Sequence, residues 1–331
     1  GKLTPSFDRK EIYLMLQCFI TKEGTLAEVP VQDIEKGCWI SLTDPSREEL
    51  RLVADVARLP SLDMLKAALD DEERAHIEID EGNILIVINI PFMEDENSFD
   101  TLPLGIVITA DYFITISLRE NKVISFFNSD NNKFFQTFRK TPFMFQILFR
   151  SAKLFLRYLR YINRHTEHIE EELMRSLKNK GLIQMMEIEK SLVYFTTALK
   201  SNSMVIERVS RLLRNKNNTY IQPLTEEDED LLEDIIIENK QALEMVEIHS
   251  NILSSMMDAF ASIINNNMNN VMKFLAVMTI LLAIPTMLAS FWGMNVHVPF
   301  QKSHYGFFFV MMFASLLTIV TGIVLWKKNK F

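Results

Sequence analysis

Two long uncharged segments lie near the end of the chain, at residues 274–292 and 306–326. At about 1.5 Å per helical residue, each would measure roughly 28–32 Å, close to the hydrocarbon thickness of a bilayer. A buried helix of a soluble protein seldom lacks a polar face over this length. Trp292, Tyr305 and Trp326 lie at the ends of the segments, as interfacial aromatic residues do. The pattern therefore predicts two transmembrane helices.

Lysines flank these segments on one side. Lys273 precedes the first, and Lys327, Lys328 and Lys330 follow the second. Because cytoplasmic flanks carry more Lys and Arg, we expect both chain ends in the cytoplasm and residues 293–305 outside. Lys302 in that loop weakens this asymmetry without reversing it. The N-terminus has no apolar core of signal-peptide type, so we expect a multi-pass protein of the cell membrane with a large cytoplasmic part.

Residues 1–140 have the alternation of an α/β domain, which we expect to be cytoplasmic. Strand-like runs at 75–80 and 83–91 are separated by Glu81-Gly82 and predict one hairpin. A second hairpin is predicted around Ala110-Asp111. Between earlier strand-like runs, residues 45–59 predict a helix, with Thr43 or Asp44 as its cap and Pro45 opening it.

Helical periodicity dominates after residue 140. Residues 141–224 predict an antiparallel helical hairpin that starts at Thr141-Pro142 and is broken at Gly181. Thr225 and the acidic residues after it signal the start of a stalk helix, 225–273. No Pro or Gly follows until Pro285, so one helix should run directly into the span 274–292, for a total of roughly 100 Å.

Composition excludes several classes of protein. The chain has 35 Lys and Arg against 43 Asp and Glu, a formal charge of −8, which argues against a nucleic-acid-binding protein. Cys18 and Cys38 suggest no disulfide framework. Phosphate-binding loops and the common hydrolase and zinc-protease motifs are absent, so we expect neither an enzyme nor an ATP-driven pump, and no cofactor.

The first predicted span carries a stripe of small and polar residues. At alternating steps of four and three from Ser262, the sequence places Asn265, Asn269, Met272, Ala276, Thr279, Ala283, Thr286 and Ser290. Small residues allow close packing of membrane helices, which is one interpretation. The other is a water-filled axis between identical copies, favoured because amides below the bilayer add nothing to packing at the lipid side. Two spans cannot enclose a path, so such an axis requires a ring of subunits.

The tripeptide Gly293-Met294-Asn295 follows the first of the two spans, which begins in "NNVMKFLAVMT". With the basic tail, this arrangement resembles the CorA family of divalent-cation channels. The stretches "WISLTDPSREEL", "ALDDEERAHIEID" and "LIVINIP" also resemble the cytoplasmic domain of that family. The resemblance covers essentially the whole chain. It implies a homopentameric funnel that conducts Mg²⁺, with Co²⁺ and Ni²⁺ as further candidate ions.

The resemblance also assigns residues to the pore. Asn295 would ring the outer mouth, where neutral carboxamide oxygens can accept hydrogen bonds from the water shell that Mg²⁺ sheds reluctantly. Gly293 would permit a tight turn, and Met294 would pack rather than coordinate. The implied pore lining is Asn269, Met272, Ala276, Thr279, Ala283, Thr286 and Ser290. Lys273, Lys327, Lys328 and Lys330 would form a basic collar at the cytoplasmic end.

Regulation by cytoplasmic Mg²⁺ is implied by the same resemblance. Asp234 on the stalk matches an acidic position of the family, and its partner on the next subunit would be Glu94 or Asp95. Asp258 matches another acidic position. A divalent ion between apposed carboxylates would turn repulsion into attraction. A solvated acidic helix face is the alternative interpretation.

Two features leave alternatives open. The outer loop has no acidic residue to gather cations and carries His297, Lys302 and His304, so a related zinc-transporting branch remains a candidate. A non-conducting, membrane-anchored signalling protein is the alternative from another class. His165, His168 and Glu172 have a spacing that could hold zinc, although a charged helix surface explains them more simply.

Overall fold

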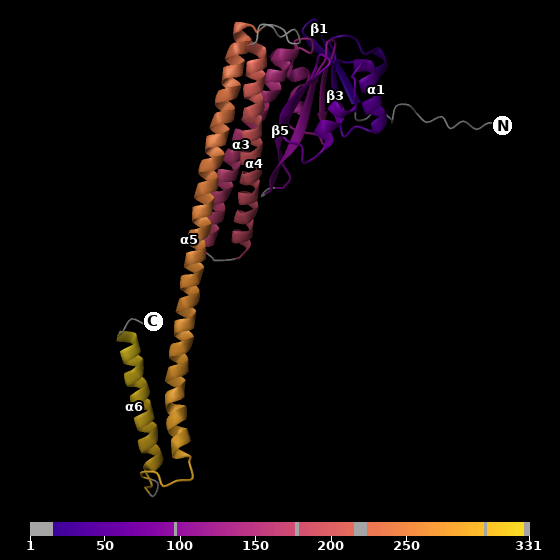
Figure 1. Ribbon diagram of the computed structural model, residues 1–331. Helices are drawn as coiled ribbons and strands as arrows, with labels where there is room; N and C mark the ends of the chain where they lie inside the picture. The colour runs from indigo at the N-terminus through magenta and orange to yellow at the C-terminus, as the bar shows by residue number, and fades with distance from the viewer. Residues whose placement is uncertain (1–15, 96–97, 176–178, 215–223, 301–302, 328–331) are drawn as a thin grey trace, which may run out of the picture. The chain divides into compact units, whose positions relative to one another are not determined.

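The computed structural model describes residues 16–95, 98–175, 179–214, 224–300 and 303–327. The chain divides into two compact units, residues 1–254 and 255–331. The first contains a seven-stranded sheet with helices on both faces, and the second contains the last part of the long helix and a shorter helix that follows it (Figure 1). The α/β part, the long helix and the two apolar helices are as predicted.

The sheet has the order β2-β1-β3-β7-β6-β5-β4, and only β3 and β7 are parallel. Its strands are β1 (Leu16–Lys22), β2 (Thr25–Glu28), β3 (Trp39–Thr43), β4 (His76–Asp80), β5 (Asn83–Met93), β6 (Phe99–Ile108) and β7 (Phe113–Ser117). Both predicted hairpins, β4–β5 and β6–β7, are confirmed. Short 3-10 helices are η1 (Val31–Asp33), η2 (Ala67–Leu69), η3 (Ile124–Phe126) and η4 (Ser129–Phe134).

Strand β2 was not predicted, although its turn repeats a signal found at the predicted β4–β5 hairpin. Glu23-Gly24 and Glu81-Gly82 each form a two-residue loop in which both residues have positive φ, from 44° to 88°. Positive φ at both positions matches the twist of a tight hairpin. A four-residue, mostly exposed strand carries too little apolar alternation to be found without that turn.

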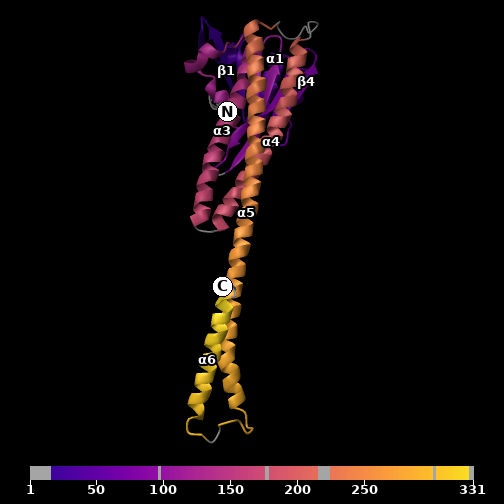
Figure 2. The same cartoon turned by 90° about the vertical axis from the view of Figure 1, so that its left-hand side faces the viewer.

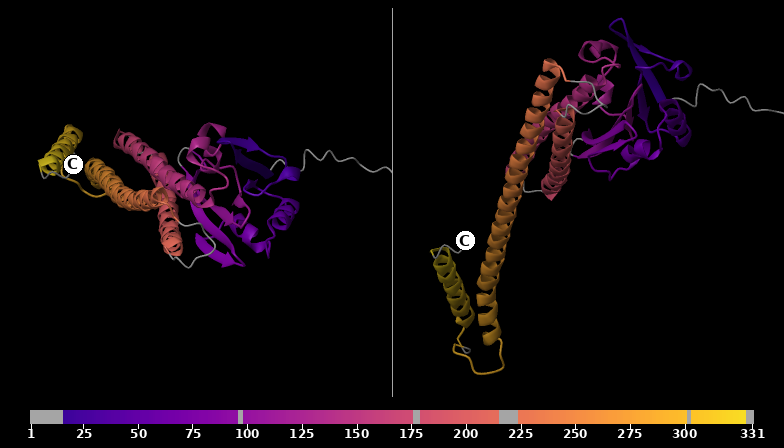
Figure 3. Two further views of the ribbon diagram at one scale, coloured as in Figure 1. Left: turned by 90° about the horizontal axis from the view of Figure 1, so that it is seen from above. Right: turned by 45° about the horizontal axis from the view of Figure 1, so that its top comes forward.

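Each face of the sheet is covered by helices. The helices α1 (Arg47–Ala57) and α2 (Asp63–Lys66) pack on one face, where Val53 and Leu65 join Leu42, Val87 and Ile114 in a buried cluster. On the other face, Phe143 of α3 stacks on Phe113 at 4.5 Å between ring centroids and meets Trp39 edge-on at 5.1 Å. Figure 3 shows α3 between the sheet and the first part of α5.

The predicted cap of α1 is wrong. Ser46, not Thr43 or Asp44, is the cap, and Pro45 lies before the helix rather than in its first turn. The Ser46 hydroxyl accepts from the Glu49 N–H at 3.2 Å, while the Glu49 carboxylate accepts from the Ser46 N–H at 2.7 Å. This reciprocal pair satisfies two N–H groups that a single Thr or Asp cap would not.

The helices α3 (Lys140–Arg175) and α4 (Asn179–Arg214) form the predicted antiparallel hairpin. Phe155 stacks edge-on against Phe195 at 5.0 Å, and Gly181 lies against Leu173. Two predicted details are wrong: α3 begins one residue before Thr141, and Gly181 lies inside α4. A Cβ on Gly181 would stand 2.8 Å from the Leu173 side chain, so this glycine permits close helix contact and does not end a helix.

Helix α5 (Glu226–Trp292) starts and continues as predicted. The Thr225 hydroxyl accepts from the Asp228 N–H at 3.3 Å, and Asp228 accepts from the Thr225 N–H at 3.1 Å. Within the first unit, α5 lies along α3 and α4 (Figure 2). Asn239 of α5, only 3% exposed, donates to the Ser203 hydroxyl at 2.7 Å. The last helix is α6 (Gly306–Lys327).

The β5–β6 hairpin extends beyond its neighbours. Strand β4 pairs with β5 only as far as Val87, and β7 pairs with β6 only from Leu104. Residues 88–93 and 99–103 therefore form a two-stranded hairpin extension, which would be marginal alone. Helix α4 supports it. The Asn202 amide accepts from the Asn89 N–H at 2.9 Å and donates to the Asn89 carbonyl at 2.7 Å, replacing a neighbouring strand.

Asn202→Ala tests this support. Losing both hydrogen bonds leaves the Asn89 backbone unpaired, so we expect a loss of about 1–3 kcal/mol in the free energy of unfolding. Urea unfolding followed by Trp39 fluorescence, with Trp292 and Trp326 replaced by Phe, measures it. The matched control is Thr197→Ala on the same helix, whose exposed hydroxyl donates only within α4. Equal losses in both variants would contradict the role of Asn202.

Candidate functional site

Both α5 and α6 contain a stretch long and apolar enough to cross a membrane. Helix α6 covers one stripe of α5, in which Val277 is buried and Leu281, Ile284 and Leu288 are half-buried. Gly322 of α6 lies close to Leu281, because a Cβ on this glycine would meet the Leu281 side chain at 3.7 Å. The chain thus uses a large aliphatic stripe of its first span to bind its second span.

The small and polar stripe predicted from the sequence lies on another side of α5. At about 100° per residue, its centre is roughly 140° around the helix from the stripe that α6 covers. Its seven members from Asn269 to Ser290 are all exposed in the chain: Asn269, Met272, Ala276, Thr279, Ala283, Thr286 and Ser290. We call this surface the polar seam. It remains free for water or for another copy of the chain.

Two threonines of the polar seam are oriented by their own helix. The Thr279 hydroxyl donates to the Leu275 carbonyl at 2.8 Å, and the Thr286 hydroxyl donates to the Leu282 carbonyl at 2.9 Å. Since each hydroxyl hydrogen is used within the helix, the oxygen lone pairs remain as acceptors. Water around a cation presents hydrogens outward, so acceptors of this kind suit a hydrated cation.

The tripeptide directly follows α5. The Gly293 N–H donates to the Ala289 carbonyl at 3.0 Å and the Met294 N–H to the Phe291 carbonyl at 3.4 Å, so these residues extend the last turn. The chain turns at residues 293–296, directly after α5, where a tight turn was predicted. Gly293 itself does not adopt a positive φ, and its missing Cβ would lie 3.4 Å from the Ala289 carbonyl. The exposed Asn295 side chain has no hydrogen-bond partner among the described residues, so it is not a helix cap.

Phe300, near the other end of the loop between α5 and α6, packs onto α6, which was not predicted. The Phe300 ring stacks on Phe309 with centroids 5.5 Å apart and planes inclined by 9°. A Cβ on Gly306 would stand 2.7 Å from the Phe300 carbonyl oxygen, so only glycine fits there without a shift. His297 and His304 are both exposed.

The predicted basic collar is described only in part. Lys273 is exposed on α5, and Lys327 is exposed as the last residue of α6. Lys328 and Lys330 lie outside the described residues.

The predicted regulatory acids are exposed and belong to different places. Asp234 lies on α5 in the first unit, and Asp258 lies on α5 in the second. Glu94 and Asp95 lie in the turn at the tip of the hairpin extension, where both N–H groups donate to the Ser98 carbonyl, at 3.0 and 3.2 Å. No cluster of three metal-binding side chains occurs within the described part of the chain. That part includes His168, whose Nδ1 lies 3.9 Å from Glu172.

Two further residues near this turn escaped the sequence analysis. Asp100 is the second residue of β6, and Lys190 of α4 is exposed. The pKa of Lys190 is raised, chiefly by its side-chain hydrogen bond with Tyr194, with smaller contributions from the carboxylates of Asp100 and Glu94. No spacing in the sequence joins residue 190 to residues 94 and 100, so only the fold could reveal this group.

Comparison with known proteins identifies the family. The sequence model described as the CorA-like Mg2+ transporter protein matches residues 35–328. The chain belongs to this CorA family. The predicted resemblance is therefore confirmed.

Relatives share most of their length with this CorA-family chain. The cobalt/magnesium transport protein CorA of Methanocaldococcus jannaschii is 27% identical over 316 residues, covering 91% of this chain and 95% of the relative. The protein of the same name from Thermotoga maritima is 20% identical, covering 100% and 94%.

Solved structures show the same fold. The complete CorA magnesium transporter of M. jannaschii matches with a TM-score of 0.79 at 24% identity, covering 94% of this chain and 97% of that one. The ZntB cytoplasmic domain from Vibrio parahaemolyticus matches at 0.59 and 11% identity, covering 76% and 98%. Because both share the fold, the fold does not separate the CorA and ZntB branches.

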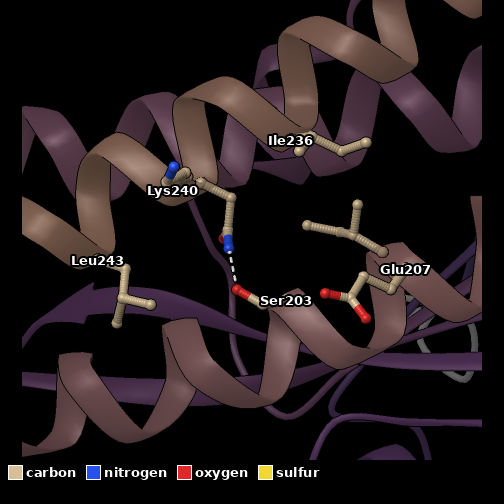
Figure 4. A pocket seen from close by; sticks show the side chains of 7 residues that line it. Ser203, Glu207, Ile236, Lys240 and Leu243 are labelled. Atoms are coloured by element: carbon tan, nitrogen blue, oxygen red, sulfur yellow. Dashed lines mark hydrogen bonds between the residues drawn. The ribbon is translucent and has the colours of Figure 1, made fainter.

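The groove between α4 and α5 does not add a metal site. A groove of about 150 Å³ between α4 and α5 is crossed by the hydrogen bond from Asn239 to Ser203 (Figure 4). Glu207 is the only carboxylate among its lining residues. One carboxylate is a poor match for a divalent ion that prefers six or more oxygen ligands.

Cysteine labelling tests whether the polar seam is accessible to water. Ala283→Cys in lipid vesicles should react with a charged, water-soluble thiol reagent, whereas Leu282→Cys on the neighbouring apolar side should not. The native thiols give little background because Cys18 and Cys38 are buried. Burial raises the pKa of Cys18 to about 12. Labelling of Leu282→Cys alone would place the polar seam away from water.

Proposed function

We propose that this chain is the subunit of a homopentameric channel that admits hydrated divalent cations, above all Mg²⁺, into the cytoplasm. The observation that carries the proposal is the exposure of the polar seam on the side of α5 that α6 leaves free. A surface made of Thr and Ser hydroxyls and Ala methyl groups gains little free energy from contact with lipid. Five such surfaces around an axis would line a water-filled path.

Selection would begin at Asn295. Its side chain has no hydrogen-bond partner among the described residues, so its amide oxygen is available to accept from water. Mg²⁺ keeps its inner water shell tightly, and a ring of neutral oxygens can bind that shell without trapping the ion by full charge. Below this ring, the Thr286 and Thr279 oxygens would repeat the same contact. The membrane potential and the ion gradient would drive entry.

The proposed topology follows from the flanking charges. Residues 1–140, 141–224 and 225–273 would form the cytoplasmic α/β domain, helical hairpin and stalk. Residues 274–292 and 306–326 would cross the membrane, with the loop 293–305 outside and the tail 327–331 inside. Lys273, Lys327, Lys328 and Lys330 would surround the cytoplasmic end of the path.

Regulation would use cytoplasmic Mg²⁺. Asp234 is exposed on α5, and Glu94 and Asp95 are exposed at the tip of the hairpin extension, so each lacks a buried role within its own chain. Across a subunit boundary these carboxylates would repel one another without a divalent ion and attract with one bound. Asp258 would supply a second position of this kind. High internal Mg²⁺ would therefore hold the channel closed.

Ion influx into vesicles loaded with a Mg²⁺-sensitive dye tests conduction. Asn295→Ala should reduce Mg²⁺ influx by roughly tenfold, because a ring of acceptors contributes about 1 kcal/mol or more to the permeating ion. His297→Ala is the matched control in the same exposed loop and should leave influx unchanged. If the unmodified protein shows no influx under a favourable potential, the channel proposal is wrong and a non-conducting signalling protein is the better interpretation.

The same vesicles separate Mg²⁺ from Zn²⁺. The ZntB likeness of the fold makes zinc the second candidate ion. Zinc influx that exceeds Mg²⁺ influx and is lost in His297→Ala would favour the zinc-transporting branch.

Limited proteolysis tests regulation without measuring flux. Millimolar Mg²⁺ should protect the full chain, and Asp234→Ala should raise the Mg²⁺ midpoint of protection by about threefold or more, since it removes one charge of the site. Glu233→Ala, the neighbouring exposed acid on α5, is the control. An unchanged midpoint in Asp234→Ala would remove this residue from the sensor.

A further inference from the structure

A cavity of about 250 Å³ lies where the β5–β6 hairpin extension meets α3 and the segment that follows β7. Strand β7 ends at Ser117, opposite Leu104, so no strand continues beside the far part of β6. The chain instead leaves the sheet and forms η3, which leaves space under the hairpin extension. Pro91, Phe92 and Met93 at the end of β5 give this cavity an apolar wall.

The wall that follows β7 is fixed by Asn121, which is only 8% exposed. Its Oδ1 accepts from the Ile124 N–H at 2.9 Å, and its carbonyl accepts from the Ser125 N–H at 3.1 Å. These bonds hold the backbone of the segment and use neither the Lys122 nor the Ser125 side chain. The cavity is therefore formed before any ligand arrives, as most small-molecule sites are.

Tyr158 of α3 brings a free hydroxyl to the cavity. Only 6% of this residue is exposed, and its ring packs against Phe99 with centroids 5.4 Å apart. The hydroxyl has no hydrogen-bond partner among the described residues, and it is not one of their unpartnered oxygens that are sealed from solvent. A buried tyrosine usually finds a partner for its O–H. The cavity that Tyr158 lines is where this hydroxyl can meet one.

A cation lies over the same ring. The Lys122 Nζ is 5.5 Å from the centroid of the Tyr158 ring, and it makes no ion pair within the described part of the chain. The Ser125 hydroxyl, which also lines the cavity, has no partner there either. Arg119 lies over Phe92 of the apolar wall, with its guanidinium carbon 5.6 Å from the ring centroid. The cavity thus combines an apolar wall with hydrogen-bond donors and positive charge.

Glu120 limits the charge of a ligand that the cavity can hold. It is the only carboxylate among the lining residues. Together with Lys122 and Arg119, it leaves one net positive charge around the cavity. A polyanion would be repelled by Glu120 and incompletely balanced by the two cations, whereas a single negative charge matches the surplus. The volume is at the small end for a ligand site, which favours a small molecule.

We propose that this cavity binds a small organic carboxylate. Its carboxylate oxygens would accept from the Tyr158 hydroxyl and the Ser125 hydroxyl and lie beside the Lys122 ammonium. Its hydrocarbon part would contact Phe92 and Met93, where burial of apolar surface favours binding. The bound molecule would join the hairpin extension to α3 and to the segment after β7, because all three contribute to the cavity.

Calorimetric titration of the full chain in lipid nanodiscs tests the ligand class with hexanoate as the probe. A dissociation constant of about 1 mM or below is expected for a ligand of this size. Hexanamide lacks the charge and acetate lacks the hydrocarbon part, so each should bind at least about fivefold more weakly. Empty nanodiscs give the contribution of the lipid. Absent binding of hexanoate, or tighter binding of pyrophosphate than of hexanoate, would contradict the proposal.

Tyr158→Phe removes only the hydroxyl and keeps the ring against Phe99. It should raise the dissociation constant of hexanoate by about three- to tenfold, the effect of one lost hydrogen bond. Tyr161→Phe is the matched control, because its ring also meets Phe99, at 5.8 Å, but does not line the cavity. Lys122→Gln should raise the constant by about two- to fivefold, and by less in about 0.5 M monovalent salt.

Hydrogen exchange of the same preparations locates the site. Hexanoate should slow amide exchange in peptides that cover residues 90–93 and 119–125, and it should leave η4 unchanged. An unchanged affinity in Tyr158→Phe, an equal loss in Tyr161→Phe, or protection confined to other segments overturns the proposal.

Discussion

Contact between α6 and one aliphatic stripe of α5 determines which side of the first apolar helix stays available. Val277, Leu281, Ile284 and Leu288 are used for this contact, so the surface bearing Thr279 and Thr286 cannot be covered by the same chain. Hydrocarbon offers no donors to the hydroxyl oxygens, so that surface is better suited to water or protein than to lipid. The proposed ring of subunits is a consequence of this division of one helix into sides.

The first unit follows a similar logic. Strands β5 and β6 extend beyond their neighbours, and a two-stranded ribbon needs outside support. Helix α4 provides it with side chains that replace missing strand partners: Asn202 at Asn89 and Ser191 at Phe99. Glu94 and Asp95 can therefore stay exposed to solvent, while the backbone of the two strands is supported by α4.

Features encoded within short stretches of sequence were predictable. The Thr225 start of α5, the two uncharged helices and the Glu81-Gly82 hairpin each depend on neighbours within a few residues. Gly181 was misjudged because its role depends on Leu173 across the helical hairpin. The polar seam could be found by helical periodicity. The stripe that α6 covers could not, since the remaining sides of this part of α5 are all apolar. The hydrogen bond from the Phe99 N–H to Ser191 likewise depends on tertiary contact between α4 and β6.

The stacking of Phe300 on Phe309, with Gly306 close to the Phe300 carbonyl, has a consequence for binding to the loop between α5 and α6. It anchors the C-terminal end of the loop to the first turns of α6. The Gly293 and Met294 N–H groups anchor the N-terminal end of the loop to α5. Little chain between these two anchors is left to lose conformational freedom when something docks there. An antibody or a designed binder raised against this rim would therefore meet a largely preformed epitope, and its affinity would depend on shape match more than on loop ordering.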